Sequence, residues 1–155
     1  MKQITCREIE TDDKLDFFTL VDEFYHSDGV HKPIPRSHYQ RTFQYIMENR
    51  NLANAFLLYS NSDLAGYGQI SFAYSNEAGG FVLWIEEVYI RQDFQGQGLG
   101  SYFINYILTE YQNKVRRIRL EVEPENIGAK GLYERLGFRT LVYEPYYIDY
   151  AFPEL

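Results

Sequence analysis

One stretch of this chain constrains its fold more than any other. In residues 81–90 the odd-numbered and the even-numbered positions are both apolar, and only the adjacent Glu86 and Glu87 interrupt the run. A half-exposed strand alternates apolar and polar residues, whereas a strand that is buried on both faces is apolar throughout. The stretch therefore predicts a strand at the centre of a sheet. A glycine-rich segment, residues 95–100, follows it, and apolar residues then recur at helical spacing to about residue 111.

The rest of the chain predicts alternating helices and strands without a linker or an internal repeat. Further helices are expected at about 11–25, 37–48 and 126–136, and further strands at 2–9, 54–59, 64–74, 117–123, 138–143 and 146–151. A chain of 155 residues is about the size of one domain. We therefore expect a single mixed α/β domain over residues 1–155, with a central sheet of about seven strands flanked by about four helices.

Charge and cysteine content exclude several classes of function. The net charge of −7 disfavours nucleic-acid binding and favours cationic ligands such as amines. The single cysteine, Cys6, excludes an internal disulfide and a cysteine-based zinc site, and fits a cytoplasmic location. No signal region or membrane-spanning run is visible, so no membrane partner is expected. The spacing of His26, His31 and His38 matches no helical ligand pair, and no metal is expected.

The glycine-rich segment predicts an anion-binding turn at the start of a helix. Glycines let backbone N–H groups approach a ligand closely, and a helix N-terminus has partial positive charge. No Gly-Lys-Ser/Thr follows, so the segment is not a P-loop, and Gly100 falls one residue too early for the dinucleotide-binding pattern. From the segment alone, a flexible turn without a ligand is the alternative.

Two sequence blocks resemble the GCN5-related N-acetyltransferase (GNAT) family. The first is Gln95-x-x-Gly98-x-Gly100 after a strand and before a helix, which is similar to the family's acyl-CoA pyrophosphate loop. The second begins at Asn126 and includes Tyr133 and the Gly137-Phe138 pair. Residues 85–90 resemble the small-amine members of polyamine type. The resemblance implies a GNAT fold, an acetyl-CoA co-substrate and, at the level of the family, a homodimer.

The resemblance also implies which residues hold coenzyme A. The backbone amides of the loop would bind its pyrophosphate, and the backbones of Val88 and Ile90 would hydrogen-bond to the pantetheine arm. Asn126 would contact the arm near its thiol end. The loop residues are Gln95, Gly96, Gln97, Gly98, Leu99 and Gly100. Gln95 stands where many family members have arginine, which removes one charged contact to phosphate.

The chemistry requires a base for the amine and an acid for the leaving thiolate. An alkyl ammonium has a pKa of about 10.4 and must lose a proton before it attacks the thioester. Resemblance favours Glu86 as the base and Glu87 as an amine-binding residue, and implies that Tyr133 is the acid. Neighbours on a strand point to opposite faces unless a bulge intervenes. The alternatives are that the glutamates pair with an arginine across the sheet and that Tyr133 is a core residue.

These observations predict an N-acetyltransferase that transfers an acetyl group from acetyl-CoA directly to a small primary amine in a ternary complex. Two alternatives remain: a protein or peptide N-acetyltransferase, and a non-catalytic acyl-CoA-binding module on the same fold. Residues 26–36 are expected to contact the acceptor or to be a simple loop. Trp84 and the aromatic segment 143–150 are expected in the core or, for the segment, at a dimer edge.

Overall fold

The computed structural model describes residues 2–28, 30 and 32–151, which form two compact units. The first comprises residues 1–121 and the second residues 122–155, and each is described here by itself. The expectation of one domain over the whole chain stays a prediction.

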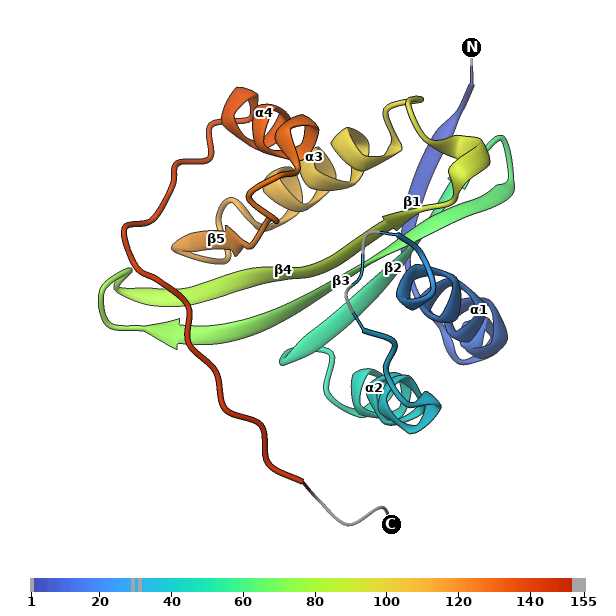
Figure 1. The fold of residues 1–155 in the computed structure, drawn as a ribbon, viewed down its shortest axis with the longest axis horizontal. Helices are drawn as coiled ribbons and strands as arrows, with labels where there is room; N and C mark the ends of the chain where they lie inside the picture. Colours follow the sequence, from blue (N-terminus) through green and yellow to red (C-terminus); the bar gives the residue numbers. More distant parts are fainter. Residues whose placement is uncertain (1, 29, 31, 152–155) are drawn as a thin grey trace. The chain divides into compact units, whose positions relative to one another are not determined.

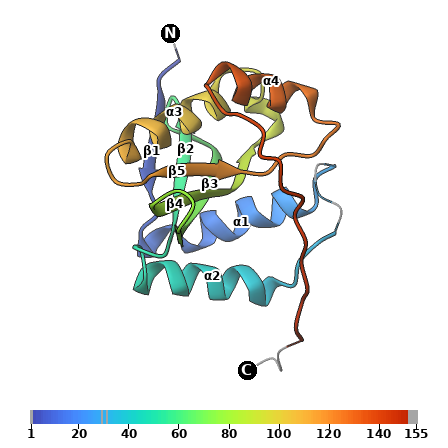
Figure 2. The ribbon, with the colours of Figure 1, turned by 90° about the vertical axis from the view of Figure 1, so that its left-hand side faces the viewer.

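The first unit has three layers, with a five-stranded sheet in the middle. Its strands lie in the order β1-β2-β3-β4-β5, antiparallel except for the parallel pair β4–β5. α1 and α2 cover one face, and α3 lies on the other (Figures 1 and 2). The elements are β1 (Ile4–Glu8), η1 (Thr11–Asp13), α1 (Lys14–Tyr25), α2 (Arg36–Glu48), β2 (Ala53–Ser60), β3 (Asp63–Ser75), β4 (Gly80–Ile90), η2 (Gln92–Phe94), α3 (Leu99–Tyr111) and β5 (Arg117–Leu120).

The core is aromatic on the face that α1 and α2 cover. Phe17 packs against Phe43 of α2 and edge-on against Tyr67 of β3, with ring centroids 5.9 and 5.8 Å apart. On the opposite face, the Phe103 ring of α3 contacts Phe56 at 5.8 Å and lies where a side chain at Gly68 would stand. Successive residues of β3 thus face opposite sides of the sheet, as in any regular strand.

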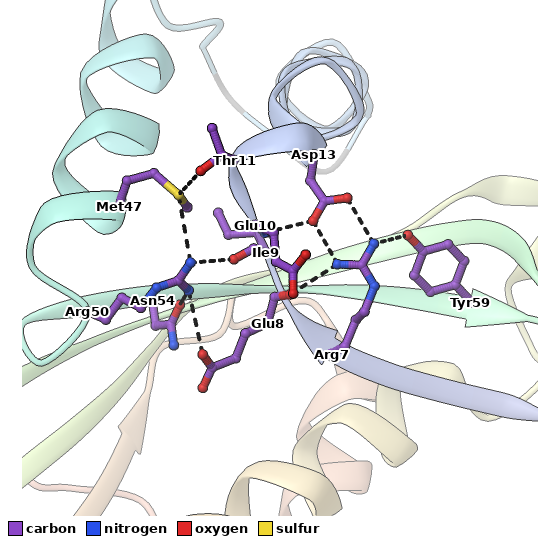
Figure 3. Close-up of polar contacts among 10 residues, drawn as sticks. All are labelled: Arg7, Glu8, Ile9, Glu10, Thr11, Asp13, Met47, Arg50, Asn54 and Tyr59. Atoms are coloured by element: carbon purple, nitrogen blue, oxygen red, sulfur yellow. Dashed lines mark hydrogen bonds and ion pairs between the residues drawn. The ribbon is translucent and has the colours of Figure 1, made fainter.

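A polar network attaches the start of α1 to the sheet (Figure 3). The Arg7 guanidinium of β1 donates to both oxygens of Asp13 at 2.7 and 2.8 Å and to the Tyr59 hydroxyl at 2.9 Å. Asp13 is buried and also accepts from the Glu10 amide. Arg50, just after α2, donates to the Ile9 carbonyl at 2.6 Å. Side chains therefore join the helical layer to β1 and β2 at this end.

The second unit contains the helix α4 (Ile127–Arg135), which Gly137 follows with φ +94°. The expected helix at 126–136 is therefore present. The expected strands at 138–143 and 146–151 are wrong: within residues 139–151 the structure has no strand, and the sheet has five strands rather than seven. Aromatic residues favour strands, but a strand forms only where its backbone pairs with a neighbour. Tyr146 and Tyr147 are instead about nine-tenths exposed.

Candidate active site

A bulge in β4 places both adjacent glutamates on one face of the sheet. Gln69 of β3 is opposite Glu87, but the next residue, Ile70, is opposite Ile85, so Glu86 is the extra residue. Glu86 accepts from Ser71, and Glu87 accepts from Tyr67, four residues earlier on β3. Side chains four apart on a strand share a face. The expectation of opposite faces in a regular strand is therefore wrong here, because the bulge adds one residue to the alternation.

The Glu86 side chain opens on a cavity. Its side chain is exposed, and Ser71 Oγ lies 2.5 Å from its Oε1. Together with Trp84, Ile85 and Glu121 it surrounds a cavity of about 240 Å³. Trp84 is half-buried here rather than a core residue, and the Arg119 guanidinium lies 4.1 Å from the centre of its ring. The cavity thus combines two carboxylates with an aromatic wall.

Glu87 lies deeper, between two phenols. Tyr67 donates to its Oε1 at 2.9 Å, and Tyr25, the last residue of α1, donates to its Oε2. Burial raises the pKa of the Glu87 carboxyl, and the neighbouring Glu86 charge adds to the rise, while the two phenols oppose it. Within residues 2–28, 30 and 32–151, neither glutamate forms an ion pair with an arginine or lysine. The structure therefore does not support the alternative of a cross-sheet arginine pair.

The second half of β4, beside the bulge, has one edge that pairs with no described strand. β5 pairs with β4 only from Val82↔Arg117 to Ile85↔Leu120. Of the described strands, β3 alone pairs with the stretch from Glu87 to Ile90. The backbones of Val88 and Ile90 lie in this stretch, and the Ile90 carbonyl accepts from the Gln95 side chain at 3.0 Å. An extended ligand can hydrogen-bond to such an edge as an added strand would.

The glycine-rich segment connects this edge to α3. Gly96 and Gly98 have φ of +71° and +86°, and Leu99 is the first residue of the helix. A β-carbon at Gly96, Gly98 or Gly100 would meet no atom within 4 Å. The first N–H groups of a helix have no partner within it, so the amides of Leu99 and Gly100 are available to a ligand. The Gln97 side-chain amide donates to the Asp93 carbonyl at 2.9 Å, and the Lys2 ammonium donates to the Gln97 side-chain oxygen. These features fit the anion-binding turn that the sequence predicts, which stays a prediction.

Asn126 and Tyr133 lie in the second unit, on α4. Asn126 is the N-cap residue, and its Oδ1 accepts from the Ala129 amide at 3.1 Å. Tyr133 is half-buried, its ring packs against Phe138 at 5.8 Å, and burial raises the pKa of its hydroxyl. Both residues thus have a local structural role, and their predicted contacts with coenzyme A and the thiolate stay predictions.

Four residues that surround the two glutamates were not predicted from the sequence: Tyr25, Tyr67, Ser71 and Glu121. Tyr25 is 62 residues from Glu87 in the sequence, so no local pattern connects the two. For Glu121 there was a signal, because it continues the polar side of the strand that contains Arg117 and Arg119. Among the described residues, no group of three or more histidine, cysteine or acidic side chains is placed to hold a metal ion. In the same part of the chain, no helix is long and apolar enough to cross a membrane.

The sequence pattern of the Acetyltransferase (GNAT) family matches residues 15–138. The chain therefore belongs to this family, and the resemblance seen in its two sequence blocks is confirmed. Its fold agrees: the structure of AAC(6')-Iy in complex with the bisubstrate analogue CoA-S-monomethyl-acetylneamine superposes with a TM-score of 0.78 and 16% identity, covering 96% of this chain and 99% of that one. The α/β class, the mixed sheet and the presence of four α-helices among the described residues are as expected.

Two curated relatives are acetyltransferases with named acceptors. Thialysine N-epsilon-acetyltransferase of Sus scrofa is 35% identical over 81 residues, 52% of this chain and 47% of the relative. Spermine/spermidine N(1)-acetyltransferase of Bacillus subtilis is 29% identical over 86 residues, 53% of this chain and 57% of the relative. The chain thus spans about half the length of these relatives.

Proposed function

We propose that this protein transfers an acetyl group from acetyl-CoA to a primary amine of a small molecule, by direct attack in a ternary complex. The observation that supports this most is the bulge in β4, which puts two carboxylates beside a free strand edge that continues into the glycine-rich segment. Family membership supports acetyl transfer, and the named acceptors of the two relatives, thialysine and spermine or spermidine, support a small amine.

The features of the first unit fit coenzyme A. Its pyrophosphate would lie against the amides of residues 95–100, where no side chain blocks the approach. Its pantetheine arm would lie along the free edge of β4, with hydrogen bonds to the backbones of Val88 and Ile90. The acetyl thioester would then lie near the bulge, and Asn126 would contact the arm near its thiol end.

In the proposed reaction Glu86 prepares the amine. Its exposed carboxylate, held by Ser71 at the cavity, takes a proton from the acceptor's ammonium directly or through a water. The amine nitrogen then forms a bond to the thioester carbonyl carbon, whose oxygen becomes an oxyanion. As the oxyanion collapses, the carbon–sulfur bond breaks and coenzyme A leaves as a thiolate. Tyr133 gives its phenolic proton to this sulfur, and Glu87 binds the amine through its negative charge.

A thiol-release assay tests the proposal. Purified protein is given acetyl-CoA and a panel of amines that includes spermidine, thialysine and peptides with free N-termini, and free thiol is measured. We expect turnover with small amines, and Glu86→Gln should reduce kcat by about 100-fold or more. The control is Glu48→Gln, on an exposed carboxylate at the end of α2.

Each outcome separates the proposal from its rivals. Turnover with peptides alone would indicate a protein acetyltransferase. Coenzyme A binding without turnover on any amine would indicate a non-catalytic binding module. A Glu86→Gln variant as active as the Glu48→Gln control would mean that Glu86 is not the base.

A further inference from the structure

A partly buried hydrogen-bonded cluster holds the Glu87 carboxylate from two sides. The Tyr67 hydroxyl reaches Oε1 from the neighbouring strand β3, and the Tyr25 hydroxyl reaches Oε2 from the end of α1. The Tyr67 side chain is completely buried, and its ring packs against Phe24 at 6.2 Å. The Tyr25 ring packs edge-on against Phe24 at 5.0 Å. Both phenols are therefore fixed by aromatic packing, and they fix the carboxylate in turn.

The hydrogen bonds leave the carboxylate able to accept more. An ionised carboxyl group has about four acceptor positions, and one phenol at each oxygen uses only two of them. The donors are neutral, so the negative charge is stabilised but not cancelled. A phenol cannot replace the ammonium of a ligand in this respect, because it brings no positive charge.

The charged groups around Glu87 favour a cation at this position. The groups that face it are Tyr25 from α1, Tyr67 from β3 and Glu86 from β4 itself. The nearby Arg91 is occupied by Glu23, which it contacts through Nε and Nη2 at 2.9 and 2.8 Å. Two adjacent carboxylates on one face, without an ion pair to any described lysine or arginine, repel each other, and a cation between them would relieve this repulsion.

We propose that Tyr25 and Tyr67 are positioning residues for the acceptor amine, which hold the Glu87 carboxylate oriented toward the ammonium beside Glu86. This inference rests on the proposed function, since it assigns a role within the same site. The Tyr25 hydrogen bond has a second effect. It is the last residue of α1, so its hydrogen bond ties the start of the α1–α2 connection to the amine-binding carboxylate. Removal of its hydroxyl should therefore weaken acceptor binding without changing the proton transfer at Glu86.

The test compares Tyr25→Phe and Tyr67→Phe with Tyr39→Phe. Tyr39 is a matched control, because it is buried and its hydroxyl donates to a carboxylate outside the site, that of Asp22 in α1, at 3.2 Å. With spermidine as the acceptor, each of the first two variants should raise KM by about tenfold, the effect of one lost hydrogen bond to a charged group. kcat at saturating spermidine should stay within about twofold, since the base is unchanged.

The pH dependence gives a readout that a purely structural role would not move. Loss of one phenol removes a contact that favours the ionised carboxyl, so the pKa of Glu87 should rise further in Tyr25→Phe. The acidic limb of kcat/KM should then shift to higher pH, and the Tyr39→Phe profile should match the wild type. Equal KM and equal pH profiles in all three variants would overturn the proposal.

A measurement without turnover separates this inference from the proposed function. The Glu87 carboxyl, assigned by comparison with Glu87→Gln, is titrated by carbon-13 NMR in the wild type and in Tyr25→Phe, with and without spermidine. We expect a higher apparent pKa in the variant and a fall in the wild-type pKa when spermidine binds. If no amine gives thiol release but both titrations show the expected pKa values, catalysis is refuted and the positioning role stands. Active enzyme with identical titrations in both proteins would refute the positioning role alone.

Discussion

Gly98→Val is the sharpest test of the coenzyme A loop, because its effect on protein stability can be separated from its effect on coenzyme A binding. Gly98 has φ of +86° at the N-cap of α3, and an added β-carbon would meet no atom within 4 Å. The substitution is therefore not a steric clash. Its cost in the free protein is the backbone strain of a left-handed, β-branched residue, about 1–2 kcal/mol. For a chain of this size that corresponds to a fall in Tm of about 2–8 °C.

The cost to coenzyme A binding should be larger. Relief of the strain turns the backbone out of the left-handed region, and this moves the amides of Leu99 and Gly100 that would face the pyrophosphate. The valine side chain would also occupy the open space through which phosphate oxygens approach. We expect at least a tenfold loss of affinity, about 1.4 kcal/mol, measured by isothermal titration calorimetry on the folded variant.

Gly79→Val is the matched control for strain. Gly79 has φ of +75° in the turn between β3 and β4, and a β-carbon there would also meet nothing within 4 Å. Its substitution should lower Tm by a similar amount and leave coenzyme A binding unchanged. Two results would refute the reasoning. One is wild-type affinity in Gly98→Val, and the other is an equal loss of affinity in both variants.

Three further predictions follow from the site and from the network in Figure 3. Tyr133→Phe keeps the ring and should lower kcat by about 100-fold with little change in Tm, measured by thiol release and calorimetry; lower stability with intact kcat would make Tyr133 a core residue. With spermidine, kcat/KM should fall as salt rises from 10 to 300 mM, because salt screens the attraction between the acidic site and a cation; a flat profile would indicate a neutral acceptor pocket. Arg7 holds the pKa of Asp13 below its usual range, so Asp13→Asn should lower the free energy of unfolding by about 1–2 kcal/mol at pH 7. The difference in this free energy between variant and wild type, measured by urea unfolding, should shrink as pH falls through and below about 4. A difference that is constant from pH 7 to pH 2 would contradict this assignment.

Two observations on the site show where sequence patterns stop being informative. The adjacency of Glu86 and Glu87 and the glycine spacing at residues 95–100 are local features, and the strand and the helix start that they predicted are present as β4 and the start of α3. That these residues form the site of acetyl transfer stays a prediction. The relative orientation of the two carboxylates was not predictable, because a bulge is a property of two paired strands. It depends on which residue of β3 lies opposite which residue of β4.

The number of strands illustrates the same limit on the scale of the fold. Alternating and apolar runs predicted β1 to β4 at nearly their observed bounds, since each has a period that its own residues determine. The strand expected at 117–123 is shorter, because β5 ends at Leu120. The aromatic residues of segment 138–151 have the same strand propensity, yet its described part has no strand. Propensity is local, whereas the hydrogen bonds that define a strand need a partner backbone.

The family followed from the resemblance of two sequence blocks to known members. By itself, the sequence also determined the helices, the central strand and the loop before α3. These depend on hydrophobic period and on glycines at fixed spacing, which are properties of neighbouring residues. Only the tertiary structure decided that Glu86 opens on the cavity with Glu121 while Glu87 lies between Tyr25 and Tyr67. The physical reason is that the chemical environment of a carboxylate comes from whatever groups the fold brings next to it, and here those groups come from α1, from β3 and from the residue after β5, which are separate from β4 along the chain.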